Sequence, residues 1–305
     1  FGLGISEMDK VLLILILLKL IGISLMKFAG IILFLLIASI GFSQEQEQPK
    51  GQIQKGSFYV YWGWNHGWYT RSDINFKGDG YDFTLEDVIA NDRQSKFNLN
   101  TYFNPVLLTI PQYNFRVGFF INENYNISFG IDHMKYVVQS GQTANINGSI
   151  NSTGTEFDGS YANDDIVLSN DFLRFEHSDG LNYINFELRR FDEIINLNNV
   201  KINLTEGFGL GALYPKTNAV LFGKERYDEF LLSGYGICGV LGINVSIYKH
   251  FFIQSELKGG FMDLPHIRTT SIGSDKASHN FFLSQLNIVF GSRLNLKKNK
   301  TTDNK

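Results

Sequence analysis

A two-residue alternation of apolar with polar or small side chains recurs in eight segments of this sequence, and it constrains the fold more than any other feature. In the segment 279–295, Phe282 and Leu286 fall on one face while Gln285 and Arg293 fall on the other. Such a period is typical of β-strands, whose successive side chains point to opposite faces. The sequence offers no helices or second layer to cover eight apolar faces, so we predict that a lipid bilayer covers them.

The connections between these segments alternate in length. The eight predicted strands are 57–70, 112–122, 125–138, 180–193, 199–213, 230–247, 250–265 and 279–295. Short turns separate some of them, whereas 71–111, 139–179, 214–229 and 266–278 are long. Short turns at one end and long external loops at the other are typical of outer-membrane barrels. We therefore predict an all-β fold, a closed antiparallel eight-stranded transmembrane β-barrel with both termini in the periplasm.

The N-terminal part of the sequence predicts export. Met26-Lys27 gives a basic start, 28–42 is apolar, and Gly41-Phe42-Ser43 has the small-x-small pattern of a signal-peptide cleavage site. We expect this apolar segment to be helical and to lie outside the barrel. The expected division is 1–25 as an upstream extension or an anchor, 26–43 as signal peptide, 44–56 as periplasmic lead-in, 57–296 as barrel and 297–305 as polar tail.

Composition excludes several classes of function. Cys238 is the single cysteine, so no intramolecular disulfide and no CxxC metal site can form. The formal net charge is −3, and the one lysine-rich run is short and terminal, which argues against nucleic acid as a partner. We expect no metal and no cofactor. The expected partners are outer-membrane lipid, lipopolysaccharide and the barrel-insertion machinery.

Two residues interrupt the outward apolar face. Strict alternation places Glu206 on the lipid side, and it places His133 there near the external end of its strand. A β-bulge at Glu206-Gly207 would turn the carboxylate inward, because a bulge adds one residue and reverses the following side chains. We therefore expect Glu206 to face the lumen.

The inward face carries charges of both signs. An interior of eight strands is just wide enough for side chains to fill, so paired charges there predict a plugged lumen. The predicted charge network consists of Arg116, Asp132, Glu187, Arg189, Glu256, Lys258 and Arg293.

Inward glycines suggest a second feature, a bare wall on the fifth and sixth predicted strands. Large side chains from the opposite wall can fill this space, or a small pocket for a lipid headgroup or acyl chain can remain. The residues of that possible pocket are Tyr59, Tyr61, Gly207, Gly209, Gly234 and Gly236.

One segment has the residue types of a hydrolase. His177 and Ser178 precede Glu187, and the segment faintly resembles the motif of outer-membrane lipid A deacylases, in which a His and a Ser two residues later share a strand face. Here the two residues are adjacent, so they point to opposite faces unless the strand bulges. A strand-cap network of His177, Asp179 and Asn182 that only orders the loop is the alternative.

The chain from residue 44 onward resembles the uncharacterised outer-membrane β-barrel proteins of Bacteroidota, and its leader Met26–Gln44 resembles leaders of that phylum. The resemblance implies location and fold, and it transfers no catalytic residue. One departure is the polar tail after Leu296, where many such barrels end on an aromatic residue. The segments that carry the resemblance are Phe58–Trp68, Tyr81–Leu85, Gly130–Tyr136, Glu176–Glu187, Arg189–Phe191 and Lys258–Phe261.

Three functions remain open at this point. The leading hypothesis is a non-enzymatic barrel whose long loops have a structural or surface-binding role. The second is a lipid A-modifying hydrolase that uses His177, Ser178 and Glu187. The third is a narrow channel.

Overall fold

The computed structural model describes residues 55–96, 98–104, 107, 111–197, 199–224, 227–248 and 250–295. The predicted segments 1–25 and 26–43 and the tail 297–305 lie outside the described residues. The described part is all-β, as predicted, and its strands form one antiparallel sheet. It contains one helix, α3 (Leu99–Phe103), and nothing helical within it has the length and apolar character that a membrane crossing requires.

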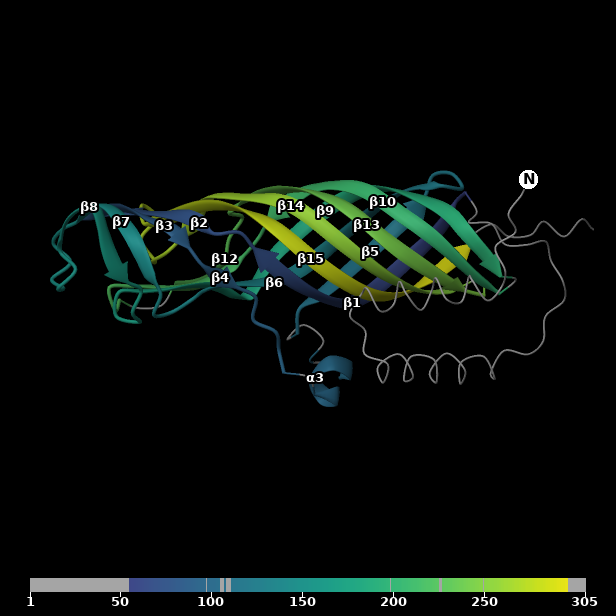
Figure 1. The fold of residues 1–305 in the computed structure, drawn as a ribbon, viewed down its shortest axis with the longest axis horizontal. Helices are drawn as coiled ribbons and strands as arrows, with labels where there is room; N and C mark the ends of the chain where they lie inside the picture. Colours follow the sequence, from purple (N-terminus) through teal and green to yellow (C-terminus); the bar gives the residue numbers. More distant parts are fainter. Residues whose placement is uncertain are drawn as a thin grey trace, which may run out of the picture. The chain divides into compact units, whose positions relative to one another are not determined.

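Eight strands form a ring of hydrogen-bonded neighbours (Figure 1). Each pairs antiparallel with the next, and the first pairs with the last from Ser57 opposite Asn295 to Tyr69 opposite Leu283, which closes the ring. In ring order the strands are β1 (Ser57–Tyr69), β5 (Tyr113–Phe120), β6 (Tyr125–Val138), β9 (Leu173–Leu197), β10 (Val200–Leu213), β13 (Gly234–Ile247), β14 (Phe251–Arg268) and β15 (Lys276–Asn295).

The outward face of the ring carries an exposed apolar band, because each ring strand alternates in burial along its length. The short helix α3 touches this face, where its Tyr102 packs on Trp64 at a ring-centroid distance of 5.9 Å, and no described strand forms a second layer over the band. Its exposed large side chains include Phe58, Val60, Phe115, Val117, Phe119, Ile127, Phe129, Phe186, Leu188, Phe208, Leu210, Tyr235, Ile237, Leu241, Leu257, Phe282 and Leu294.

The expected bulge at Glu206 is wrong. β10 pairs with β9 and β13 without interruption there, and its one register shift lies between Ile202 and Asn203. Glu206 therefore stays exposed on the outward face. Its partner across the strand pair is Arg190, so an opposite charge faces this carboxylate.

The segments expected as long connections are largely folded into strands beyond one end of the ring (Figure 1). We call this part the cap. β2 pairs with β15 and β11 pairs with β9, so the cap is continuous with the ring. The cap strands are β2 (Ser72–Gly78), β3 (Tyr81–Val88), β4 (Ala90–Asn91), β7 (Thr143–Ile150), β8 (Gly159–Val167), β11 (Lys216–Leu221) and β12 (Tyr227–Phe230).

The cap has an apolar core of its own, because its strands also alternate. Phe76 and Phe83 stack at a ring-centroid distance of 5.3 Å, and Phe172 and Phe222 lie 5.8 Å apart. This core continues into the adjoining end of the ring through buried side chains such as Tyr183. The cap end of the ring is therefore closed by packed apolar side chains.

One edge of the cap is open. Among the described strands β8 pairs only with β7. Asn163 has a positive φ of 66°, and the register of the pair shifts between Ile146 and Asn147. The exposed Asp164 and Asp165 follow directly on this edge.

Ring closure depends on a close approach of β1 to β15 at Gly63. A Cβ atom there would lie 2.1 Å from the carbonyl oxygen of Ile288 and 2.4 Å from Cα of Val289, which are backbone atoms that cannot turn away. We expect Gly63→Ala to lower the free energy of unfolding by about 1–3 kcal/mol, as overpacking does. Urea unfolding of the full chain in detergent micelles measures it.

Gly259→Ala is the matched control, because a Cβ there meets nothing within 4 Å. Its unfolding midpoint should stay at the wild-type value. Equal midpoints for the two variants would contradict the tight β1–β15 contact.

Candidate functional site

The middle of the ring is filled by buried charges. Glu187 forms an ion pair with Arg116 at 2.8 Å and accepts a hydrogen bond from Arg189 Nε at 2.5 Å. Arg189 also pairs with Glu256, and the Tyr61 hydroxyl accepts from Arg116 Nε at 2.9 Å. These side chains come from β1, β5, β9 and β14, so the network ties opposite walls of the ring together.

The network continues through a buried lysine. Lys258 Nζ pairs with Asp132 and lies 2.8 Å from Glu187. Asn114 donates to Asp132 at 2.7 Å, and Asn287 donates to Glu256 at 3.1 Å. The six charged side chains of the network are each at most 1% exposed, and their charges balance as three cations and three carboxylates. Such balance is required because an unpaired buried charge is very costly.

Arg293 lies apart from these six residues. Its guanidinium carbon lies 5.4 Å from the ring centroid of Phe120 and 5.7 Å from that of Phe252. Within the described part of the chain it makes no ion pair. Together with Tyr59 and Phe191, these rings form an aromatic layer at the short-turn end of the ring.

The glycine-lined wall is occupied. A Cβ at Gly207 would lie 2.8 Å from Cγ of Arg189, and one at Gly209 would lie 2.7 Å from Cγ of Glu187. The glycines thus make room for the charge network.

The glycines of this wall nearer the cap are also closely covered. A Cβ at Gly234 would lie 1.9 Å from the carbonyl oxygen of Asp263, and one at Gly236 would lie 2.4 Å from Sδ of Met262. Tyr59 and Tyr61 belong to the aromatic layer at the opposite end. The structure does not join these residues into one pocket.

The hydrolase candidates also lie apart. His177 is fully buried in the cap core, where Nδ1 lies 3.0 Å from Oγ1 of Thr217, whereas the Ser178 hydroxyl points away and donates to Glu176 at 3.1 Å. Burial lowers the pKa of His177 to about 3, so its imidazole is neutral. Glu187 follows ten residues later on the same strand, about 30 Å away at roughly 3.3 Å per residue. No triad is assembled from the three.

His177 does not join the alternative strand-cap network either, because its partner is Thr217. The other members of that network lie on the outer wall, where Asn182 contacts His133 Nδ1 at 2.8 Å and Asp179 pairs with Lys216 at 3.2 Å. His133 faces outward, as expected, and is 7% exposed beneath its neighbours.

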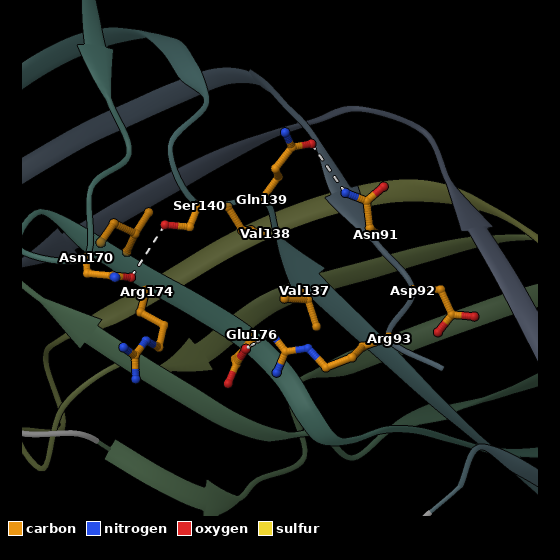
Figure 2. A pocket seen from close by; sticks show the side chains of 11 residues that line it. Asn91, Asp92, Arg93, Val137, Val138, Gln139, Ser140, Asn170, Arg174 and Glu176 are labelled. Atoms are coloured by element: carbon orange, nitrogen blue, oxygen red, sulfur yellow. Dashed lines mark hydrogen bonds and ion pairs between the residues drawn. The ribbon is translucent and has the colours of Figure 1, made fainter. Parts of the chain in front are cut away.

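A cavity of about 430 Å³ opens beside the cap, where β4, the end of β6 and the start of β9 meet (Figure 2). We call it the cap cavity. Arg93 pairs with Glu176 at 2.8 Å, and Asn218 and Ser178 also donate to Glu176, which fixes this carboxylate. The lining residues are Asn91, Asp92, Arg93, Val137, Val138, Gln139, Ser140, Asn170, Leu173, Arg174 and Glu176.

Arg93 and Arg174 are the two exposed cations of this cavity, and Arg93 is engaged by Glu176. Arg174 shares the outward face of β9 with Glu176, and within the described residues no hydrogen bond or ion pair occupies its guanidinium. Asp92, by contrast, is held 3.0 Å from His66 and accepts from the backbone N–H of Gly67. The cavity therefore presents a guanidinium among amide and hydroxyl groups, a set suited to an acidic polar ligand. Sequence patterns missed these residues, because they look like ordinary solvated loop residues.

Comparison with solved structures finds outer-membrane β-barrel proteins as neighbours. The outer membrane protein OprG from Pseudomonas aeruginosa has 12% sequence identity and a TM-score of 0.37, with 79% of this chain and 97% of that chain covered. AlkL has 8% identity and a TM-score of 0.37, with 84% and 99% covered. Ail of Yersinia pestis has 9% identity and a TM-score of 0.31, with 79% and 100% covered.

No protein-family model matches the sequence, and no curated protein matches it. At identities and TM-scores this low, the neighbours carry no argument about function.

The charge network predicts a large effect of removing one partner. Glu187→Gln leaves three buried cations with two carboxylates, and breaking a buried pair in this way costs about 3–5 kcal/mol. We expect a loss of that size in the free energy of unfolding, measured by urea unfolding in detergent micelles. Asp192→Asn removes the exposed partner of Arg190 and should change little, since water screens such pairs. Similar losses for both variants would refute a structural role of the network.

Proposed function

We propose that this protein is a closed, plugged outer-membrane β-barrel that acts by binding at its external face. Support for the membrane location comes from the apolar band, which no described strand covers and which suits contact with lipid. Short turns at one end and the cap at the other support an orientation with the cap outside and the termini in the periplasm. A Bacteroidota origin and the signal peptide 26–43 remain part of the proposal.

The filled interior is the observation that favours a binding role for this protein over a channel function. An aromatic layer, a charge network and the apolar cap core follow one another along the ring axis. Solute flow would require parting buried ion pairs and the packed core at the same time. The exterior is then where this molecule offers accessible polar groups.

The cap cavity is the external site that we assign to binding. Arg174 offers a bidentate guanidinium, and Asn91, Gln139 and Asn170 offer amides at the rim (Figure 2). This chemistry suits a carboxylated or sulfated sugar better than an apolar ligand. The hydrolase alternative has less support, since no assembled triad accompanies it.

The absence of a channel is testable by conductance. Full-length protein inserted into planar bilayers in 1 M salt, roughly the usual condition for single-channel recording, should give no steady opening steps, because its lumen is closed at several levels. Insertion is checked by the shift on boiling of protein recovered from vesicles of the same preparation, since closed barrels resist SDS until heated. Steady single-channel steps from heat-modifiable protein would overturn the plugged barrel.

The cap cavity predicts binding of acidic sugars to cells that display the protein. Arg174→Gln should weaken binding to an array of carboxylated and sulfated oligosaccharides by about tenfold or more, because a hydrogen bond to a charged group contributes about 1.5–3 kcal/mol. Lys77→Gln, an exposed cap cation paired with Asp82, is the matched control and should bind like the wild type. If Arg174→Gln binds the oligosaccharides as well as wild type does, the cap cavity is not their binding site.

A further inference from the structure

A second hollow of about 380 Å³ lies on the outer wall of the ring, at the external border of the apolar band. We call it the wall notch. Its volume falls within the range of small-molecule sites, which is roughly 300–1,000 Å³. It is lined by Tyr113, Ile131, His133, Asp179, Asn182, Ile184, Tyr214 and Phe230.

An interruption in the pairing of β6 with β9 creates the notch. Met134 pairs with Leu181 and Tyr136 with His177, so three residues of β9 lie opposite one residue of β6. Gly180 adopts φ +127°, and a Cβ there would lie 2.6 Å from the His133 ring. Because Gly180 has no side chain, the His133 imidazole can pack directly against it. The unpaired residues of β9 place Asp179 at the rim of the notch.

Two stacked pairs of rings line the notch. Tyr113 stacks on His133 at 5.0 Å and 14°, and Tyr214 stacks on Phe230 at 5.8 Å and 6°. Asn182 links the two pairs, because its Oδ1 lies 2.8 Å from His133 Nδ1 and its Nδ2 donates to the Tyr214 carbonyl at 3.1 Å. The polar groups are therefore fixed between aromatic faces in the folded chain.

The charges of the notch favour a neutral polar ligand. No lysine or arginine is among its lining residues. Two lysines lie near the lining residues. Lys216 pairs with Asp179 at 3.2 Å and with Asp228 at 3.4 Å, and Lys135 acts electrostatically on His133 and Asp179. A phosphate would lie against the Asp179 carboxylate and compete with it for Lys216, whereas neutral sugar hydroxyls can pair with carboxylate, amide and imidazole groups.

An apolar track runs from the notch into the band. Ile131 and Ile184 form its apolar base, and the next outward residues on the same two strands are Phe129 and Phe186, whose ring centroids lie 5.0 Å apart. Both phenylalanines are exposed, at 45% and 56%. A ligand with a polar head and an acyl chain matches this layout better than a free sugar does.

We propose that the wall notch binds the neutral sugar headgroup of an outer-leaflet glycolipid, with an acyl chain lying along Phe129 and Phe186. The aromatic pairs hold the faces of the sugar ring, because polarised C–H groups pack well on the negative face of an aromatic ring. Asp179, Asn182 and His133 bind its hydroxyls. The inference rests on the proposed function, since it requires the apolar band to lie in the membrane.

The experiment uses full-length protein in phosphatidylcholine nanodiscs that contain monoglucosyl diacylglycerol as the probe, with native mass spectrometry as the readout. Sugar-based detergents are avoided because they carry the same chemistry. Wild type should retain one glycolipid per chain, and Tyr214→Ala and Asn182→Leu should each lower the retained fraction at least fivefold. Tyr235→Ala removes an exposed aromatic of the band that does not line the notch, so it should stay within twofold of wild type.

The remaining outcomes distinguish a failure of the notch proposal from a failure of the barrel proposal. The notch proposal is overturned if Tyr214→Ala and Asn182→Leu both retain as much glycolipid as wild type. It is also overturned if Tyr235→Ala loses as much glycolipid as they do. Free glucose that displaces the glycolipid at the concentration of the glycolipid itself overturns the lipid as occupant. If the wild type shows the gel shift on boiling but retains no glycolipid, the notch proposal is overturned and the barrel proposal is not. If the wild type shows no gel shift on boiling, the barrel proposal itself is refuted. Tyr214 is exposed and outside the core, so its variant should keep the gel shift.

Discussion

The pairing of β1 with β15 is the contact on which the rest of the structure depends. A sheet of this length with two free edges would expose rows of unpaired backbone N–H and C=O groups, which no lipid can satisfy. Thirteen residue pairs from Ser57–Asn295 to Tyr69–Leu283 remove both edges of the ring at once. Closure also creates the enclosed interior, and only an enclosed interior can hold ion pairs such as Arg189–Glu256 away from water.

Different physical constraints act on the interior and on the exterior of the ring. Inside, buried charges must balance, and the glycines at 207 and 209 give space to Arg189 and Glu187. Outside, the apolar band carries no such constraint, and the polar features concentrate at its external border and on the cap. This division is why the cap cavity and the wall notch lie outside the ring while the most heavily charged cluster of the ring is inaccessible.

Sequence periodicity was sufficient to predict the strands of the ring, but it was insufficient to predict the cap cavity and the wall notch. Alternation located every ring strand because one face of each is uniformly apolar, as in 279–295. It failed at Glu206, where an outward carboxylate faces Arg190 on the adjacent strand, a compensation that a single-strand pattern does not contain. Sequence periodicity also could not predict the notch. Tyr113, His133 and Asn182 come from three strands and Tyr214 from the connection after β10, and the interruption around Gly180 brings them together. Segments such as 72–88 looked like loops because they are short and polar on one face, yet their other face builds the cap core.

The continuity of the cap with the ring has a consequence for biogenesis. The lumen is filled by side chains, so a folded cap cannot pass through it. Residues of β2, β3, β7 and β8 would therefore have to cross the bilayer as extended chain and collapse onto Phe76 and Phe83 only on the far side. In the proposed membrane location, the condensed aromatic core would make the cap hairpins too bulky to pass back through the bilayer, so insertion would be irreversible.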